Sequence, residues 1–452
     1  MASQTQIPSW LNDARSPAYM RLVLETLNRR EDIRVQARRA TRHRDRSDVE
    51  FLDSDDEFYI RHGQNSNQEE SPRQKALKRF YSVAVGSHPD SDVFNRYAQL
   101  EAYDRTRVVA PIPNPPNGGP AGGEGRYLNA SWVSERLGQK WWIASQAPLP
   151  QSAHAFLSTI FHPIEKWPPY KNAGGEPEPL SSSASTGRPR IRTVVQLTKN
   201  IESGRIKAHE YFPNEVGKAI VVHPETSSDS LPQAVGTDSI PSLKVTLLKS
   251  QYVEVADCSW MTVSITSLTG NAEPPGEIAV FEHLTYTSWP DHGVPESKEE
   301  KQSLLEFLKL VEEVNRKGEA LGLTEPRDQP NSLGFGQQAS GLEKLKAEPP
   351  IIVGCSAGIG RTGTFIALAS LFRHLGVLNP ATLPTSSGDL EPSPLGPISL
   401  QRQDDGANDV GVDDLVLQEV DSLRDQRAGM VERASQVLFI YEMLDRHYSG
   451  AR

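Results

Sequence analysis

The strongest chemical signal in the chain is a run of small residues between a cysteine and an arginine. The string Cys355-Ser-Ala-Gly-Ile-Gly-Arg361 follows the apolar run Ile351-Ile-Val353 and precedes a helix-forming segment that begins at Thr364. This order predicts a strand, a tight loop and a helix. Backbone N–H groups in such a loop converge at the helix N-terminus, where they bind an anion.

Two side chains of this loop suit phosphoryl transfer. The planar guanidinium of Arg361 can grip two phosphate oxygens, which a lysine could not do. The positive field of the loop favours the thiolate of Cys355, the nucleophilic form of the residue. The other loop residues would bind the substrate through their backbone: Ser356, Ala357, Gly358, Ile359 and Gly360. A Walker-type nucleotide loop is excluded because no Gly-Lys-Ser/Thr follows.

A second segment can supply the acid that such a reaction needs. Thr287-Ser-Trp-Pro-Asp-His-Gly-Val-Pro295 follows a predicted strand. Asp291 would protonate the leaving oxygen and would then, as a base, activate water. Trp289 would anchor the loop, and Gly293 would serve as its hinge. Alone, this string is more often an ordinary turn, but beside the cysteine loop it predicts a general acid.

The elements that must position these residues follow from hydrophobic periodicity. β-branched or alternating stretches predict strands at Val194–Leu197, Ala219–His223, Leu243–Val255, Met261–Leu268 and Ile278–Trp289. Apolar stripes predict helices through Leu304, Leu305, Leu308, Val311 and Val314, through Phe365, Ala369 and Phe372, and through Val431, Leu438, Tyr441 and Leu444. The order predicts an α/β or α+β fold, with a central mixed, twisted β-sheet flanked by helices.

Composition divides the chain into two expected parts. Residues 1–60 read as an N-terminal helical, basic extension, and residues 61–452 as the catalytic domain. Stretches rich in Pro, Gly, Ser or charge predict long disordered insertions near 113–125, 174–188, 226–239, 317–348 and 379–414.

The extension contains an amphipathic stretch around Tyr19 and Leu27, followed by an arginine-rich segment from Arg29 to Arg46. The arginines are open to two interpretations, a docking or nuclear-import patch and a solvated helix face. The second is the commoner case for such runs.

The bulk composition narrows the cellular context. A formal net charge of -10 over 452 residues argues against a nucleic-acid partner. The only cysteines, Cys258 and Cys355, show no metal-type spacing, so we expect no metal, no cofactor and a reducing compartment. The first residues lack the form of a signal peptide, and no apolar run could span a membrane. The expected location is the cytoplasm, with the nucleus as a second choice.

Together these segments resemble the non-receptor, tyrosine-specific protein phosphatases. The cysteine loop Gly354–Gly363 and the Trp-Pro-Asp segment match the two signatures of that family. Further blocks are similar to its phosphotyrosine-recognition loop, next two strands, arginine-orienting loop and water-positioning loop: Asn95–Val108, Tyr127–Trp132, Ile143–Pro150, Glu202–Pro213 and Leu423–Val431. The resemblance covers most of residues 70–450.

The resemblance implies hydrolysis of phosphotyrosine in proteins through a phosphocysteine intermediate, with phosphotyrosine-containing proteins as partners. Tyr97 would stack on the substrate ring and set the depth of the pocket. Glu202 would pair with Arg361, and Lys207 would lie near the Asp291 loop. Thr362 would help Cys355 to leave in the second step. Gln436 matches a glutamine of the family.

Three positions depart from the family pattern. Gly354 replaces a histidine, Glu432 a water-orienting glutamine, and Gln99 an aspartate that grips the substrate backbone. Gly354 predicts that less of Cys355 is in the ionised, nucleophilic form and that the enzyme is weaker. Glu432 predicts slow hydrolysis of the phosphocysteine intermediate. One alternative is therefore a weakly active or inactive relative that binds phosphotyrosine. Another is a dual-specificity or phosphoinositide phosphatase, which Tyr97 and the intact acid segment disfavour.

Overall fold

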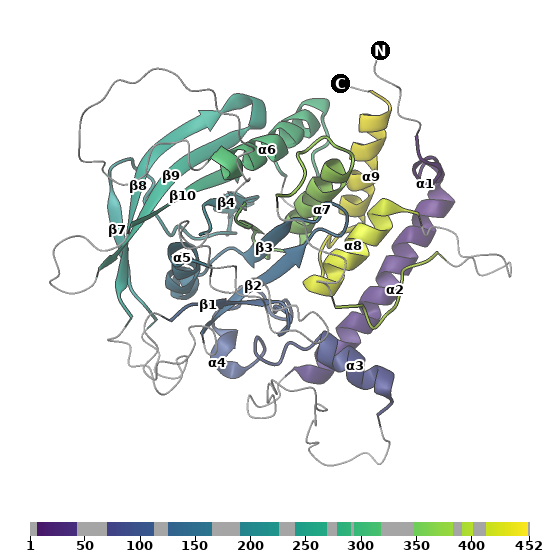
Figure 1. Ribbon diagram of the computed structural model, residues 1–452, viewed down its shortest axis with the longest axis horizontal. Helices are drawn as coiled ribbons and strands as arrows, with labels where there is room; N and C mark the ends of the chain where they lie inside the picture. The colour runs from purple at the N-terminus through teal and green to yellow at the C-terminus, as the bar shows by residue number, and fades with distance from the viewer. Residues whose placement is uncertain are drawn as a thin grey trace, which may run out of the picture.

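A nine-stranded mixed sheet forms the centre of the molecule. The computed structural model describes residues 7–42, 70–112, 125–164, 190–225, 240–268, 278–290, 293–317, 348–382, 391–400 and 413–450. The sheet has the strand order β1-β2-β3-β11-β4-β10-β9-β8-β7 (Figure 1). Its strands are β1 (Arg107–Ala110), β2 (Arg126–Ser134), β3 (Trp141–Gln146), β4 (Thr193–Gln196), β7 (Ala219–Val222), β8 (Ser242–Val253), β9 (Cys258–Leu268), β10 (Ile278–Tyr286) and β11 (Ile351–Cys355).

The strand directions confirm the predicted mixed sheet. β11 lies parallel to both β3 and β4, and β4 lies parallel to β10, whereas the remaining pairs are antiparallel. The central parallel strands therefore end at one common edge, where β11 delivers Cys355. Beside the sheet, β5 (Ile201–Glu202) and β6 (Arg205–Ile206) form a separate hairpin.

Helices cover both faces of the sheet. One apolar core contains residues of α5 (Ala153–Phe161) and the inner side chains of β8 and β9. The larger core contains residues of α6 (Lys298–Lys317), α7 (Gly360–His374), α8 (Leu415–Gln426) and α9 (Ala434–Tyr448). In Figure 1, α7, α8 and α9 lie side by side. Among the described residues, no helix is both long and apolar enough to cross a membrane.

The N-terminal helices pack into the larger core. α1 (Ser9–Asp13) and α2 (Pro17–Thr41) contribute Trp10, Leu11, Tyr19, Val23 and Leu27 to the cluster that α7, α8 and α9 also form. α3 (Pro72–Phe80) and α4 (Pro89–Asp92) follow. The predicted domain boundary at residue 60 lies outside the described residues and stays a prediction.

Two arginines of α2 match neither interpretation of the sequence, whereas Arg29 and Arg39 are exposed. Arg34 is 0% exposed and Arg38 is 6% exposed, so neither is solvated or available for docking. Their guanidinium groups contact carboxylates and a phenol of the domain instead. Arg44 and Arg46 lie outside the described residues.

Two helix predictions need correction. α7 begins at Gly360 rather than at Thr364, because the first turn of a helix needs no internal partners for its N–H groups and tolerates glycine. Val431 precedes α9 and has a φ of 53°, and Leu438 is 43% exposed. The buried face of α9 is formed by Val437, Ile440, Tyr441 and Leu444.

Four of the predicted insertions lie entirely or almost entirely outside the described residues: 113–125, 174–188, 226–239 and 317–348. Part of 379–414 is described. There Ile398 and Leu400 are buried in the larger core, so this part packs against the domain.

Candidate active site

The loop between β11 and α7 turns its carbonyl groups outward. The Ser356 carbonyl accepts from the Ala147 N–H at 3.1 Å, and the Ile359 carbonyl accepts from the N–H groups of Gly363 at 2.8 Å and Val431 at 3.2 Å. Arg427 donates to the carbonyls of Gly358 at 2.8 Å and Ala357 at 3.1 Å. A planar trans peptide directs its N–H opposite to its C=O, so the N–H groups of residues 357–360 face the inside of the loop. The loop can therefore cradle an anion at the N-terminus of α7.

Close packing against β3 explains two glycines of this loop. Gly358 has a φ of 71°, and a Cβ there would lie 2.2 Å from the Ser145 carbonyl oxygen. A Cβ on Gly354 would lie 2.7 Å from the same oxygen. The place of the family histidine is thus a position with no room for a side chain unless the backbone moves.

Arg361 is held in a fixed plane beneath the loop. Its Nη1 donates to Glu202 Oε1 at 2.7 Å, and its Nη2 donates to Glu202 Oε2 at 2.9 Å. Nη1 also donates to the Leu197 carbonyl at 3.0 Å. Such a bidentate pair fixes the orientation of the guanidinium as well as its position. The structure therefore brings together Arg361 and Glu202, as the resemblance implied.

Tyr97 lies at the rim of the loop. It is 37% exposed, and its hydroxyl lies 2.7 Å from Ser356 Oγ. Because Ser356 Oγ donates to the Lys207 carbonyl at 2.8 Å, Tyr97 is the donor in this contact. The neighbouring Asn95 is fixed from below by the Tyr127 hydroxyl at 2.8 Å. Lys207 itself is 9% exposed.

The predicted acid segment is described on both sides of Asp291, which itself lies outside the described residues. The Pro290 carbonyl accepts from Arg361 Nη2 at 3.1 Å. Trp289 is 3% exposed, and its Nε1 donates to the Gly293 carbonyl at 3.2 Å. The residue before Asp291 therefore contacts Arg361 of the cysteine motif.

Glu432 and Gln436 both reach the start of α7. A methyl group built on Gly360 would lie 2.9 Å from Gln436 Nε2 and 3.1 Å from Glu432 Oε2. Gln436 Oε1 also accepts from the Arg433 N–H at 3.1 Å, which caps α9.

Thr362 is fully buried, and within the described ranges its Oγ1 contacts no hydrogen-bond partner. That hydroxyl is therefore available to donate a hydrogen bond.

Cys355 is a free cysteine and is 6% exposed. Arg427, which binds two carbonyls of the loop that follows Cys355, was not singled out by sequence reasoning. Arg427 is 1% exposed and also donates to Ser131 Oγ at 3.1 Å and Asn129 Oδ1 at 3.0 Å. Burial lowers the pKa of Arg427 to about 10, although Tyr127 and Cys355 raise it, so the group stays charged at neutral pH. Its only signal was its place within the Leu423–Val431 block.

No group of three or more His, Cys, Asp or Glu side chains that could hold a metal ion occurs in the part of the chain that the structure describes.

Comparison with known families identifies the class of protein that this fold and site define. The family model described as protein-tyrosine phosphatase matches residues 92–163 and 188–381, more than half of the chain. The chain therefore belongs to the protein-tyrosine phosphatase family, which confirms the predicted resemblance.

Individual relatives are distant and much longer. The chain is 27% identical over 358 residues to a tyrosine-protein phosphatase Lar-like of Caenorhabditis elegans, covering 79% of the chain and 11% of the relative. It is 24% identical over 370 residues to tyrosine-protein phosphatase non-receptor type 13 of Homo sapiens, with shares of 81% and 10%. It is 26% identical over 284 residues to phosphatidylinositol phosphatase PTPRQ of Rattus norvegicus, with shares of 62% and 8%. The chain thus spans about a tenth of the length of these curated relatives.

A solved structure, PTPN18 in complex with HER2-pY1248 phosphopeptides, is 19% identical. It matches with a TM-score of 0.46 over 81% of this chain and 92% of that chain.

Proposed function

We propose that the chain hydrolyses phosphotyrosine in proteins through a phosphocysteine intermediate. The observation that carries this proposal is the loop between β11 and α7. Its carbonyls are turned outward by Arg427 and neighbouring amides, and its guanidinium is clamped by Glu202. Family membership supports the broader statement that the chain is a phosphatase.

In the first step the Cys355 thiolate attacks phosphorus, and the bond between phosphorus and the phenolic oxygen breaks. Asp291 gives its proton to that oxygen, so tyrosine leaves neutral. The inward N–H groups of residues 357–360 and the fork of Arg361 bind the phosphoryl oxygens and stabilise their charge. Tyr97, at the rim, sets the depth at which the phenyl ring lies.

In the second step water attacks phosphorus, the bond between phosphorus and sulfur breaks, and Asp291 takes a proton from the water. The Thr362 hydroxyl, buried without a partner among the described residues, would donate to the departing Cys355 sulfur. Glu432 and Gln436 adjoin the start of α7, where this water must lie. We keep the cytoplasm as the expected location, and phosphotyrosine proteins as the partners.

A second candidate function is phosphotyrosine binding with little turnover. Gly354 favours it, because the histidine of the family is absent and cannot be accommodated beside Ser145. Glu432 favours it as well, since an ionised carboxylate cannot donate the hydrogen bond by which the glutamine amide of the family would orient the attacking water. A phosphoinositide or dual-specificity activity is a third candidate, which the similarity to phosphatidylinositol phosphatase PTPRQ raises.

Turnover assays separate these candidates. Wild type should hydrolyse para-nitrophenyl phosphate and a phosphotyrosine peptide but not a phosphoserine peptide or phosphoinositide vesicles. Cys355→Ser should lose activity by about 10⁴-fold or more, since the nucleophile is removed. Asp291→Asn should lose more activity on the peptide than on para-nitrophenyl phosphate, whose leaving group needs less protonation. A Cys355→Ser protein as active as wild type would disprove the proposal.

A further inference from the structure

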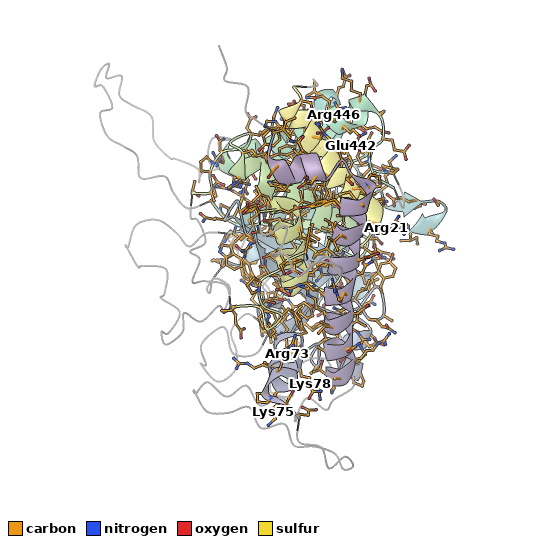
Figure 2. All side chains as sticks on the ribbon, turned by 90° about the vertical axis from the view of Figure 1, so that its right-hand side faces the viewer. Arg21, Arg73, Lys75, Lys78, Glu442 and Arg446 are labelled. Carbon is orange, nitrogen blue, oxygen red and sulfur yellow. The ribbon has the colours of Figure 1, made fainter. Side chains whose placement is uncertain are left out.

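Three arginines of α2 and the C-cap residue of that helix occur at exact four-residue intervals. Arg30, Arg34 and Arg38 share one face of the helix, Arg42 directly follows its last residue, and we call these four residues the arginine ladder. Figure 2 shows α2 running along one side of the molecule, where exposed cations such as Arg21 of α2 and Arg73 of α3 also lie. The ladder differs from those cations, because its members contact the domain.

The first two members of the ladder hold α8. Arg30 donates to both carboxylate oxygens of Asp421, at 2.9 and 2.8 Å. Arg34 donates to Asp421 at 2.7 Å and to Asp425 at 2.6 Å, with none of its surface exposed. Both aspartates lie on the last two turns of α8, directly before Arg427.

Those turns of α8 lead straight to the cysteine loop. Arg427 binds the outward carbonyls of Ala357 and Gly358. Arg424 bridges α2 to the segment before α9. It donates to the Leu27 carbonyl of α2 at 3.2 Å, and to the Met430 and Val431 carbonyls at 2.9 Å each. The Val431 N–H in turn donates to the Ile359 carbonyl of the loop.

The last two members of the ladder hold the segment that follows Tyr97. Arg38 donates to the Tyr103 hydroxyl at 3.0 Å, and Arg42 donates to Glu101 Oε2 at 2.6 Å. Glu101 is 4% exposed and Tyr103 is 0% exposed, so both acceptors are fixed within the domain. One helix thus contacts the supports of both the cysteine loop and the tyrosine-recognition loop.

Stability alone is a poor explanation for this arrangement. Each buried charge costs several kcal/mol to desolvate, and an apolar replacement often stabilises as well. α2 already buries Tyr19, Val23 and Leu27 against the same core. What the charged pairs add is geometry, because a guanidinium bound to two carboxylates fixes the register of α8 against α2.

We propose that the arginine ladder is a set of positioning residues for the active site. Arg34 sets the end of α8, and through Arg427 the cysteine loop, whereas Arg42 sets the recognition segment through Glu101. The inference rests on the proposed phosphatase function. It also assigns a role to four residues between 30 and 42, a stretch outside the ranges matched by the family model.

Steady-state kinetics test the two ends of the ladder separately. Arg34→Met should lower kcat about tenfold or more with a smaller change in KM, because a small displacement of a catalytic loop is costly. Arg42→Gln should raise KM for a phosphotyrosine peptide severalfold and leave kcat nearly unchanged. Arg39→Gln, on an exposed arginine of the same helix, is the matched control and should resemble wild type. Rates are expressed per folded molecule, measured by circular dichroism.

A purely structural role predicts a different result. Both variants would then show a lower melting temperature with wild-type kcat and KM per folded molecule, and this outcome would overturn the inference. If Arg34→Met does not fold, Arg34→Lys keeps the charge but loses the fork and should show the same loss of kcat. The double variant Arg42→Glu with Glu101→Arg restores the ion pair in reverse and should bring KM back close to the wild-type value. A general effect of surface charge would not restore KM.

Hydrogen exchange distinguishes failure of the ladder from failure of the proposed function. If wild type shows no turnover at all, the proposed activity is wrong, but the ladder is still tested. Arg34→Met should then speed amide exchange at residues 357–360 and 430–431, with no change in β8 and β9. The inference would be refuted if exchange became faster to the same extent across the whole molecule, or if the exchange rates at the loop did not change.

Discussion

Gly354 lies one residue before the proposed nucleophile, and its backbone runs against the carbonyl of Ser145. A Cβ at this position would lie 2.7 Å from that oxygen, a distance that real Cβ atoms do not show. The glycine that stands in place of the family histidine is therefore required by the close packing of β11 against β3. The difference from the family is more than the loss of one imidazole. Arg427 remains as a buried cation that binds the carbonyls of Ala357 and Gly358 in the same loop.

Restoring the histidine should consequently fail to improve the protein. Gly354→His should lower the free energy of unfolding by about 1–3 kcal/mol, because the Cβ overpacks the strand pair. Gly354→Ala should cost a similar amount, since the clash arises from the Cβ alone. Urea denaturation and turnover of para-nitrophenyl phosphate measure the two effects. A Gly354→His protein more active than Gly354→Ala, with wild-type stability, would contradict this account.

At the scale of elements, α9 connects the acid segment to the N-terminal helices. Phe439 contacts Trp289 edge to face, with 6.2 Å between ring centroids. Two residues later, Tyr441 contacts Trp10 of α1 at 6.3 Å and donates to Asp414, the N-cap of α8, at 2.6 Å. The anchor of the acid segment is therefore part of the larger core.

Truncating this contact should affect both stability and the acid step. Phe439→Ala should cost about 3–5 kcal/mol, because a fully buried ring leaves a cavity. It should also lower kcat on phosphotyrosine peptide, since Trp289 loses its support. The adjacent Leu438, 43% exposed, supplies the control, and Leu438→Ala should change neither quantity appreciably. Equal losses in the two variants would show that the Phe439 contact has no special role.

The sequence predicted much of the sheet and site but little of their support. The spacing of apolar residues was enough to predict β8, β9 and α6, because their apolar side chains alternate along the strand or form a stripe along the helix. It failed for Val431, which precedes α9, since spacing alone does not show where a helix begins. β2 and β3 were indicated only by resemblance, as their side chains are buried on both faces and show no alternation.

The missed supports share one physical cause. Arg34 and Arg427 are charged residues, which are usually exposed, and only partners far along the chain make their burial favourable. The partners of Arg34 are Asp421 and Asp425, which are separated from it by 387 and 391 positions in the sequence. Arg427 binds Gly358, at a separation of 69 positions. No local pattern encodes such separations. Cys355, Arg361 and Glu202 were found because they lie within compact motifs.

On the scale of the whole molecule, a buried ion cluster joins the sheet to its helices. Lys140, at the start of β3, donates to both oxygens of Glu312 on α6, at 2.9 and 2.8 Å. Arg373 of α7 donates to Glu312 at 2.7 Å and to Glu135 at 2.9 Å. Burial alone would raise the pKa of Glu312, but Lys140 and Arg373 outweigh it and lower the pKa to about 2.

Within this cluster the carboxylate of Glu312 predicts a loss of stability in acid, whereas burial raises the pKa of Glu135. The pKa of Glu312 in the folded state lies below its ordinary value of 4.5, so its contribution is complete above pH 4.5 and is lost as the pH falls toward 2. The loss amounts to about 3 kcal/mol. Glu312→Gln should cost roughly 3–5 kcal/mol at neutral pH and should flatten the acid limb of a urea-denaturation series.

The half-buried Glu306 of the same helix provides the comparison, because the side chains of its ion pair with Lys309 are 32% and 43% exposed. Glu306→Gln should change stability by less than about 1 kcal/mol and should keep the wild-type acid limb. An unchanged acid limb in Glu312→Gln would mean that other carboxylates govern acid unfolding.

The order of the strands also bears on oxidation. Cys258 lies in β9 and Cys355 at the end of β11, with β10 and β4 between them. Three strand spacings separate the two sulfur-bearing strands by about 14 Å, twice the reach of a disulfide. Because the chain has no third cysteine, a sulfenic acid formed on Cys355 has no resolving thiol in its own chain. Its reduction then depends on a thiol supplied from outside, such as glutathione or a second protein.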